Sequence, residues 1–398
     1  IMKILYDHQI FSAQKYGGIS RYFFELMKQL DAMDNVSYDL PLKYSNNFYL
    51  LNNPDLFHVQ RDEKTDKFFY GMDFKGKAKI HRFLGRMSIV EHPMISNLNT
   101  SVRRLKESDF DIFHPSYYDD YFIKYLNNKP FVLTVHDMIH EIYFAKHSKK
   151  SNKLILKKRE LINKASHIIA ISENTKKDII EIYNIDEKKI SVIYLGNSLD
   201  YNRSKVMDLP VPDNYMLYVG DRHAYKNFEF FIRSIQLLLL ADKKLFLVCA
   251  GSVNFTVKEK SLISRLGLTE KVIHLPLIDD AILMNLYNNA LCFVFPTLYE
   301  GFGIPVLEAF ACGSPALLSN TSSLPEVGGD AALYFDPEDA VSIFDAVKKV
   351  VYDRKLADSL RKKGYKQLQN FSWEKCALET KKVYEKVLRD SRKCNDES

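Results

Sequence analysis

Short apolar segments rich in β-branched residues alternate with segments of helical periodicity from one end of the chain to the other. Near-continuous apolar strands separated by helices are typical of parallel sheets that helices cover on both faces. The predicted strands are residues 2–7, 111–114, 131–136, 167–171, 190–195, 215–219, 245–250, 272–275, 292–295, 316–319 and 332–335. Helices are predicted between most of them, for example over 21–30, 227–240, 280–289 and 304–311. The pattern predicts an α/β protein.

The chain has 398 residues, which is too long for one ordinary hydrophobic core. The stretch from Ser198 to Pro212 contains two prolines and no clear period, so we expect the join between two doubly wound, Rossmann-like domains there. The predicted domains are residues 1–200 and 201–372, followed by a C-terminal helix (373–398) that crosses back to the first domain. Two such sheets facing each other place the loops at their carboxyl ends around a shared cleft, where ligands of this architecture bind.

The composition is that of a globular protein, with 46% hydrophobic and 27% charged residues. No run approaches the roughly 18 apolar residues of a membrane span, and the start of the chain leads into a strand pattern without the sequence of a signal peptide. Five cysteines without a CxxC pair suit free thiols in a reducing compartment. We therefore expect a cytoplasmic protein.

The net charge of +6 is unevenly spread. Seven Lys or Arg and no acid lie between Lys146 and Arg159, and a second basic stretch, residues 75–86, is mixed with apolar side chains. Both a solvated helix face and a surface attracted to anionic lipid or a phosphorylated acceptor remain open. A nucleic-acid partner is not expected, because no recognisable binding motif accompanies the charge.

The segment from Glu300 to Glu308 follows a predicted strand and its short loop. Gly301 and Gly303, on either side of Phe302, let a backbone approach a ligand closely. A helix that starts near Gly303 would present unpaired N–H groups to an anionic or hydroxyl-rich ligand. Glu308 would lie about a turn inside that helix, where a carboxylate can bind a ribose diol, and Glu300 would lie at the mouth, near a sugar.

Two further loops carry groups suited to phosphate. Arg222 and Lys226 are four residues apart around a strand-to-helix turn, where two cations can neutralise a diphosphate leaving group without a metal. Gly17 and Gly18 lie between the first strand and a helix, as in a phosphate-approach loop. The full G-x-G-x-x-G fingerprint is absent, which argues against a nicotinamide or flavin enzyme.

His136 ends a predicted buried strand, where it can contact a transferring sugar or act as a structural hydrogen-bonding residue. The acidic pairs at 119–120 and 279–280 resemble metal ligands, but we expect them in loops or helix caps and predict no metal site.

Together these segments resemble the retaining glycosyltransferases of GT-B architecture called glycosyl transferase group 1, over most of the chain and most strongly from Asn214 to Trp373. The E-x7-E signature in this setting is specific. The resemblance implies a nucleotide-diphosphate sugar as co-substrate and no cofactor. It implies that Glu308 holds the ribose and Glu300 the donor sugar, and that Arg222 and Lys226 bind the diphosphate.

The resemblance also implies that backbone N–H groups at Phe302 and Gly303 reach sugar hydroxyls, that Gly17 and Gly18 line the phosphate pocket, and that His136 lies beside the anomeric centre. Leu277 and Ile278 would lie near the base, but Pro276 before them has no N–H to donate. The variant Tyr225-Lys226-Asn227 is similar to mannosyl- and rhamnosyl-transferring members, which makes GDP-mannose the first choice of donor.

The expected reaction is transfer of a hexose, with retention, to a glycan or lipid-linked acceptor in cell-surface polysaccharide or glycolipid assembly, in the cytoplasm or at the inner membrane face. Its oxocarbenium-like transition state places negative charge on the diphosphate, where the two cations would meet it. A nucleotide-sugar epimerase or a phosphorylase of the same architecture, and a non-catalytic sugar-nucleotide-binding protein, are the alternatives. The acceptor has no motif that identifies it.

Overall fold

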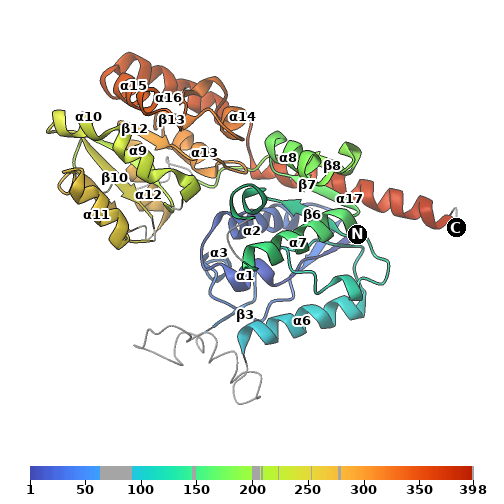
Figure 1. The fold of residues 1–398 in the computed structure, drawn as a ribbon. Helices are drawn as coiled ribbons and strands as arrows, with labels where there is room; N and C mark the ends of the chain where they lie inside the picture. Colours follow the sequence, from blue (N-terminus) through green and yellow to red (C-terminus); the bar gives the residue numbers. More distant parts are fainter. Residues whose placement is uncertain are drawn as a thin grey trace.

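The structure is a computed structural model, and it describes residues 1–62, 92–145, 149–199, 207, 209–222, 224–251, 253–276 and 279–396. The chain forms two α/β domains, and the C-terminal helix extends from the second domain along the first (Figure 1). The basic stretch at 75–86, the centre of the expected join (200–206) and the base-proximal Leu277 and Ile278 lie outside the described residues.

The second domain is built on one parallel six-stranded sheet with the strand order β11-β10-β9-β12-β13-β14. Its strands are β9 (Tyr215–Val219), β10 (Phe246–Ala250), β11 (Val272–Leu275), β12 (Cys292–Phe295), β13 (Ala316–Ser319) and β14 (Ala332–Phe335). The chain runs outward from β9 to one edge and then returns to the centre as β12. The strand order therefore reverses between β9 and β12, and a doubly wound sheet binds its ligands at such a switch point.

Alternate residues of these strands contribute to two different hydrophobic clusters, Leu217 to one and Met216 and Tyr218 to the other. Both faces of the sheet are therefore buried, which explains the near-continuous apolar strands. The helices of this domain are η5 (Ala224–Lys226), α9 (Phe228–Ser234), α10 (Gln236–Ala241), α11 (Val257–Arg265), α12 (Asp280–Asn289), α13 (Ile304–Ala311), α14 (Leu324–Gly328), η6 (Gly329–Ala331), α15 (Ala340–Tyr352) and α16 (Arg354–Leu368).

The first domain contains two parallel three-stranded sheets, with the orders β2-β1-β5 and β6-β7-β8, joined by a parallel bridge between Phe113 and Phe131. Their strands are β1 (Met2–Leu5), β2 (Val36–Asp39), β5 (Ile112–Phe113), β6 (Val132–Val135), β7 (His167–Ala170) and β8 (Ile190–Val192), and a separate pair comprises β3 (Tyr44–Ser45) and β4 (Gln60–Arg61). The helices are α1 (Gln9–Ala13), α2 (Gly18–Asp31), α3 (Phe48–Leu51), α6 (Pro93–Glu107), η1 (Ile123–Tyr125), η2 (His140–Phe144), α7 (Lys149–Lys164), α8 (Glu173–Tyr183) and η3 (Glu187–Lys189).

The last helix, α17 (Trp373–Asp396), packs against α2 of the first domain. Its Tyr384 hydroxyl is 2.6 Å from Nδ1 of His114 and 3.0 Å from the hydroxyl of Tyr6. Burial lowers the pKa of His114 to about 3, so this imidazole is neutral at ordinary pH. The second domain is thus tied to the first by a helix that follows it in the chain (Figure 1).

All predicted strands are present, some of them one to three residues shorter than predicted. Sequence reasoning missed β2, β3 and β4, whose polar residues break an apolar run and whose length is two to four residues. The helix predicted over 227–240 is two helices, because the backbone at Ile235 leaves the helical conformation between α9 and α10.

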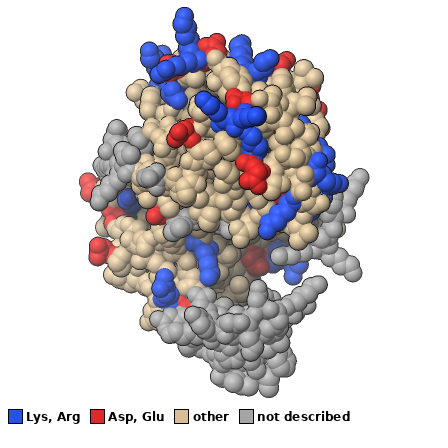
Figure 2. Space-filling model, turned by 90° about the vertical axis from the view of Figure 1, so that its left-hand side faces the viewer, with Lys and Arg blue, Asp and Glu red and all other residues tan. Residues whose placement is uncertain are grey.

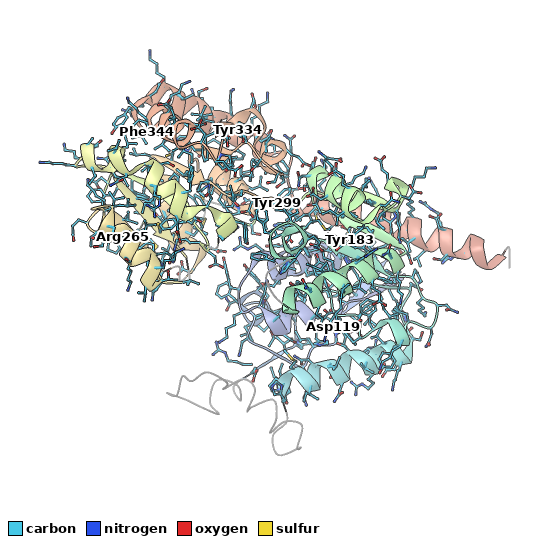
Figure 3. The ribbon with its side chains drawn as sticks, viewed as in Figure 1. Asp119, Tyr183, Arg265, Tyr299, Tyr334 and Phe344 are labelled. Carbon is cyan, nitrogen blue, oxygen red and sulfur yellow. The ribbon has the colours of Figure 1, made fainter. Side chains whose placement is uncertain are left out.

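Part of the basic run from Lys146 to Arg159 is neutralised by the fold. Lys157 pairs with Asp119 and Asp120 (Asp119 is labelled in Figure 3), and Lys158 is buried against Glu141 with an Nζ–Oε2 distance of 3.1 Å. On the face in Figure 2, the Lys and Arg side chains of the described residues are scattered, with Asp and Glu between them. No described helix has the length and apolar character that crossing a bilayer requires.

Candidate active site

The segment from Glu300 to Glu308 lies at the switch point of the second sheet. It follows β12, and its second half forms α13, whose N-cap is Gly303. The loop after β9, the other strand at the reversal, carries Arg222 and Lys226. The carboxyl ends of adjacent parallel strands meet at one sheet edge, so the topology brings these two loops together.

Lys226 and Glu300 form an ion pair across this point, with Nζ and Oε1 2.6 Å apart. Their side chains are only 17% and 11% exposed. Burial lowers the pKa of Lys226, but the charge of Glu300 opposes this and the pKa lies above its usual value. Lys226 is therefore a cation at neutral pH, available to an anionic ligand that displaces Glu300.

The Arg222 side chain does not join the Lys226–Glu300 ion pair and binds other residues of the second domain. Its Nε donates to Glu259 of α11 at 2.8 Å, and its Nη2 donates to the Val253 carbonyl at 2.7 Å. The side chain is 2% exposed, and Nη1 is buried with no hydrogen-bond partner in the described part of the chain. In this structure Arg222 binds Glu259 and Lys226 binds Glu300, and the binding of one diphosphate by both cations stays a prediction.

Gly301 brings the loop against the first domain. A Cβ at this position would lie 1.8 Å from the carbonyl oxygen of His136, so no larger residue fits without movement of the backbone. The Gly301 carbonyl accepts hydrogen bonds from Ser172 Oγ at 2.7 Å and Thr175 Oγ1 at 3.2 Å. The close neighbour of this glycine in the structure is thus His136 of the facing domain, and the predicted approach of a ligand stays a prediction.

Phe302 is buried between Tyr194 and Phe371 rather than exposed to a cleft. Gly303 has φ +102°, and a Cβ there would lie 2.9 Å from Leu324 Cδ2. This conformation favours glycine. Both residues thus fix the path of the backbone into α13.

Gly17 and Gly18 form the start of α2, and a Cβ on Gly18 would lie 3.7 Å from Ile304 Cδ1. The N-terminus of α2 in the first domain therefore lies beside the N-terminus of α13 in the second. Two helix ends with positive dipole character at one place suit an anionic ligand.

His136 follows β6 and contacts the rings of Tyr22 and Phe23 edge to face. Its residue is 6% exposed, and Nε2 has no hydrogen-bond partner among the described residues. Burial lowers its pKa to about 4, so the imidazole is neutral at pH 7. This unpaired nitrogen is able to form a hydrogen bond with a ligand.

Glu308 does not face open space in this structure. Its Oε1 accepts from Arg21 Nη1 at 2.7 Å, and its Oε2 accepts from the Tyr287 hydroxyl at 3.2 Å. Burial raises the pKa of Glu308, and the charge of Arg21 opposes that effect. Asp280 of α12 joins the same guanidinium at 3.1 Å.

Sequence reasoning assigned no role to Arg21, although a signal was present. Arg21 lies in the first turn of α2, where the helix dipole disfavours a cation. A basic residue at that position, three residues after a glycine pair, needs an anionic partner, and its carboxylate partners Glu308 and Asp280 come from the other domain.

Other contacts fasten the two domains beside the site. Glu326 accepts hydrogen bonds from the backbone N–H groups of Glu173 at 2.7 Å and Asn174 at 3.3 Å, at the start of α8. The Tyr299 hydroxyl bonds to Asp178, and Tyr299 lies between the domains in Figure 3.

The acidic pairs lie in a loop (119–120) and at the start of α12 (279–280), as expected from the sequence, and three of the four residues also form ion pairs that were not predicted. Asp119 and Asp120 bind Lys157, Asp279 caps α12 through the Ile282 N–H, and Asp280 binds Arg21. Within the described residues, no group of three or more His, Cys, Asp or Glu is arranged to hold a metal ion.

Residues 202–367 match the protein family described as "Glycosyl transferases group 1", and residues 65–201 match "Glycosyltransferase Family 4". The chain therefore carries a glycosyl transferase group 1 domain, which coincides with the second domain of the structure. The family predicted from the E-x7-E segment and its setting is thereby confirmed.

Among curated relatives, O-antigen chain mannosyltransferase B of Escherichia coli is 33% identical over 235 residues, which are 56% of this chain and 62% of that protein. O-antigen chain mannosyltransferase RfbU of Salmonella typhimurium is 31% identical over 227 residues, 55% of this chain and 60% of that protein. The chain thus spans about three fifths of the length of these two relatives.

Solved structures share the fold of the whole chain. Sucrose-phosphate synthase of Thermosynechococcus elongatus has a TM-score of 0.74 at 18% identity, covering 98% of this chain and 100% of that one. HepE of Anabaena, in complex with UDP and glucose, has a TM-score of 0.70 at 18% identity, covering 96% and 99%. The predicted GT-B architecture is confirmed.

Proposed function

We propose that this group 1 glycosyltransferase transfers mannose from GDP-mannose to a glycan or lipid-linked acceptor in polysaccharide assembly. The observation that carries the proposal is the Lys226–Glu300 ion pair at the switch point of the second sheet, with Nζ and Oε1 2.6 Å apart. The next residue, Gly301, packs against the backbone carbonyl of His136 in the first domain. The mannosyltransferase relatives support mannose as the sugar.

In the proposed reaction the donor diphosphate replaces Glu300 as the partner of Lys226. Lys226 then neutralises the charge that develops on the leaving phosphate, and Glu300 is released to accept hydrogen bonds from the sugar hydroxyls. The N-termini of α2 and α13 add positive potential at the same place. These groups act on the donor without a metal ion or a further cofactor.

The bond between the anomeric carbon and the β-phosphate oxygen breaks, and the acceptor oxygen forms its bond on the same face of the sugar. The departing phosphate takes the acceptor proton. The neutral His136 imidazole supports this assignment, because a group with a pKa of about 4 is a weak base at pH 7. Its free Nε2 is suited to a hydrogen bond with the sugar.

The first test is thermal unfolding with a panel of GDP-, UDP-, ADP- and dTDP-sugars. A ligand at about 100 times its Kd stabilises the folded state by about 2.7 kcal/mol. We expect GDP-mannose to raise the Tm and the effect to disappear in Lys226→Ala and Glu300→Ala. Lys258→Ala, which removes a 75% exposed lysine paired with Glu229 on the same domain, is the matched control.

Transfer is then followed with the stabilising donor and candidate glycan acceptors, and the anomeric configuration of the product is read by NMR. An inverted linkage would contradict the retaining mechanism. Conversion of the donor without any acceptor would identify an epimerase, and binding without turnover under every acceptor would identify a binding protein.

Membrane contact is a separate part of the proposal and has its own test. Pelleting with anionic vesicles at low and high salt should show binding that salt weakens. Lack of binding at low salt would contradict membrane contact, but it would not contradict the proposed transfer reaction.

A further inference from the structure

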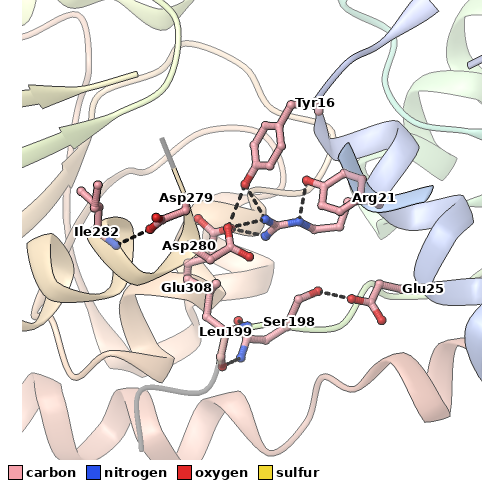
Figure 4. A network of polar contacts seen from close by, with 12 residues as sticks. Tyr16, Arg21, Glu25, Ser198, Leu199, Asp279, Asp280, Ile282 and Glu308 are labelled. Carbon is pink, nitrogen blue, oxygen red and sulfur yellow. Dashed lines mark hydrogen bonds and ion pairs between the residues drawn. The ribbon is translucent and has the colours of Figure 1, made fainter. Parts of the chain in front are cut away.

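Arg21 bridges the two domains through its whole guanidinium group. From α2 of the first domain it reaches Glu308 with Nη1 and Asp280 with Nη2, at 2.7 and 3.1 Å. Within its own domain, Nε donates to the Tyr49 hydroxyl at 2.9 Å and Nη2 to the Tyr16 hydroxyl at 2.6 Å. Figure 4 shows Tyr16, Arg21, Asp280 and Glu308 converging from the facing domains.

The two carboxylates that Arg21 binds differ in solvent exposure: Glu308 is buried and Asp280 is accessible. The side chains of Arg21 and Glu308 are 4% and 7% exposed, whereas that of Asp280 is 36% exposed. Tyr16, whose hydroxyl also donates to Asp280 at 3.0 Å, is 51% exposed. Arg21 therefore has one partner deep in the site and another at its rim.

Glu308 has little capacity left for a ligand. Arg21 binds one of its oxygens, Tyr287 binds the other, and almost no surface of the side chain is accessible. Ribose hydroxyls that bind Glu308 would donate to these same two oxygens. The ribose and Arg21 would therefore compete for Glu308, since a side chain that is only 7% exposed leaves little room for both.

We propose that Arg21 competes with the ribose hydroxyls of the donor for the Glu308 carboxylate and so sets the affinity for the nucleotide. This rests on the proposed function, in which Glu308 binds that ribose. On donor entry the guanidinium leaves Glu308 and keeps Asp280 and Tyr16 at the rim. Arg21 is in this sense a positioning residue, since it acts on the donor through Glu308.

Competition from a protein group reduces the apparent affinity by the fraction of molecules in which Glu308 is free. Arg21→Gln removes the charged competitor and keeps a polar side chain. We expect it to bind GDP about three- to tenfold more tightly than the wild type. The gain should depend on the ribose hydroxyls and on nothing else in the nucleotide.

The experiment is isothermal titration of the full chain with GDP and with 2′,3′-dideoxy-GDP. For Arg21→Gln we expect the gain with GDP and an unchanged Kd with the dideoxy nucleotide. Lys28→Gln, which removes an exposed lysine from the same helix, should match the wild type with both ligands. Arg21→Lys keeps the charge but cannot bridge Glu308 and Asp280 with a planar fork, so it should give a smaller gain with GDP only, and it tests the idea if Arg21→Gln does not fold.

Weaker binding of both nucleotides by a folded Arg21→Gln would overturn the proposal, since Arg21 would then bind phosphate directly. An equal gain with both nucleotides would overturn it as well. If the wild type binds no nucleoside diphosphate at all, both the proposed function and this inference fail. If the wild type prefers GDP to the dideoxy form and Arg21→Gln shows no gain, this inference alone fails.

Discussion

Gly301→Ala tests the junction between the candidate site and the facing domain. The new Cβ would lie 1.8 Å from the His136 carbonyl oxygen, where an ordinary contact between carbon and oxygen is about 3.3 Å. The loop must therefore move by about 1.5 Å, because both clashing groups are backbone or bonded directly to it. A displacement of this size separates Gly301 from its partners Ser172 and Thr175.

The stability change follows from those two hydrogen bonds. Each contributes about 0.5–1.5 kcal/mol, so their loss lowers the free energy of unfolding by about 2 kcal/mol. For a domain of this size that corresponds to a fall in Tm of about 4–8 °C. Glu300, the adjacent residue, moves with the loop, and a misplacement near 1 Å costs about a hundredfold in a catalytic step.

The assay is differential scanning calorimetry of Gly301→Ala without ligand, followed by donor titration and transfer rates. Gly18→Ala is the stability control: its Cβ would lie in ordinary contact, 3.7 Å from Ile304, at the first position of a helix. We expect the control to unfold within about 0.5 kcal/mol of the wild type. A Gly301→Ala protein with wild-type Tm and wild-type donor affinity would refute the close packing of the loop on His136.

Three further outcomes are expected. Glu326→Ala leaves the first two N–H groups of α8 without their acceptor and should lower the stability by about 1–2 kcal/mol, measured by urea unfolding; no change would mean that Glu326 does not fasten the domains. Burial lowers the pKa of His136 to about 4 and that of His114 to about 3, so the unfolded chain binds their protons first as the pH falls below about 6.5. The stability that the two neutral histidines contribute is complete above about pH 6.5. As the pH falls it is lost by about 1.4 kcal/mol per pH unit for each histidine, down to about pH 4 for His136 and about pH 3 for His114. Urea midpoints that stay constant between pH 7 and 5 would contradict this. Transfer should continue in the presence of EDTA, and a rate that falls with EDTA and returns with Mg²⁺ would show that a metal is needed.

Local sequence predicted the elements of the second domain well. The strands from Tyr215 to Phe335 that form its sheet are strongly apolar, because both faces are covered, and α13 begins at the predicted glycine. In the first domain β2 and β3 were missed, since short strands with polar residues carry little periodic signal.

The sequence also indicated which residues belong near the site, but the pairing of their charges was not predictable. Lys226 was assigned to a diphosphate, and in this structure it pairs with Glu300. Arg222 was assigned to the same ligand, yet it lies on Glu259, which is 37 residues further along the chain. An ion pair depends on distances of a few ångströms between side chains, and spacing along the chain does not determine them across separate loops.

The amino-acid sequence by itself determined the α/β class, the group 1 glycosyltransferase family and the glycine turn between two glutamates. These follow from periodicity and local backbone requirements, which act over a few residues. The tertiary structure decided that Gly301 rests on His136, that Lys157 and Lys158 are paired, and that Arg21 binds Glu308. The last contact joins residues 287 positions apart on two domains, and only the packing of those domains brings them within reach.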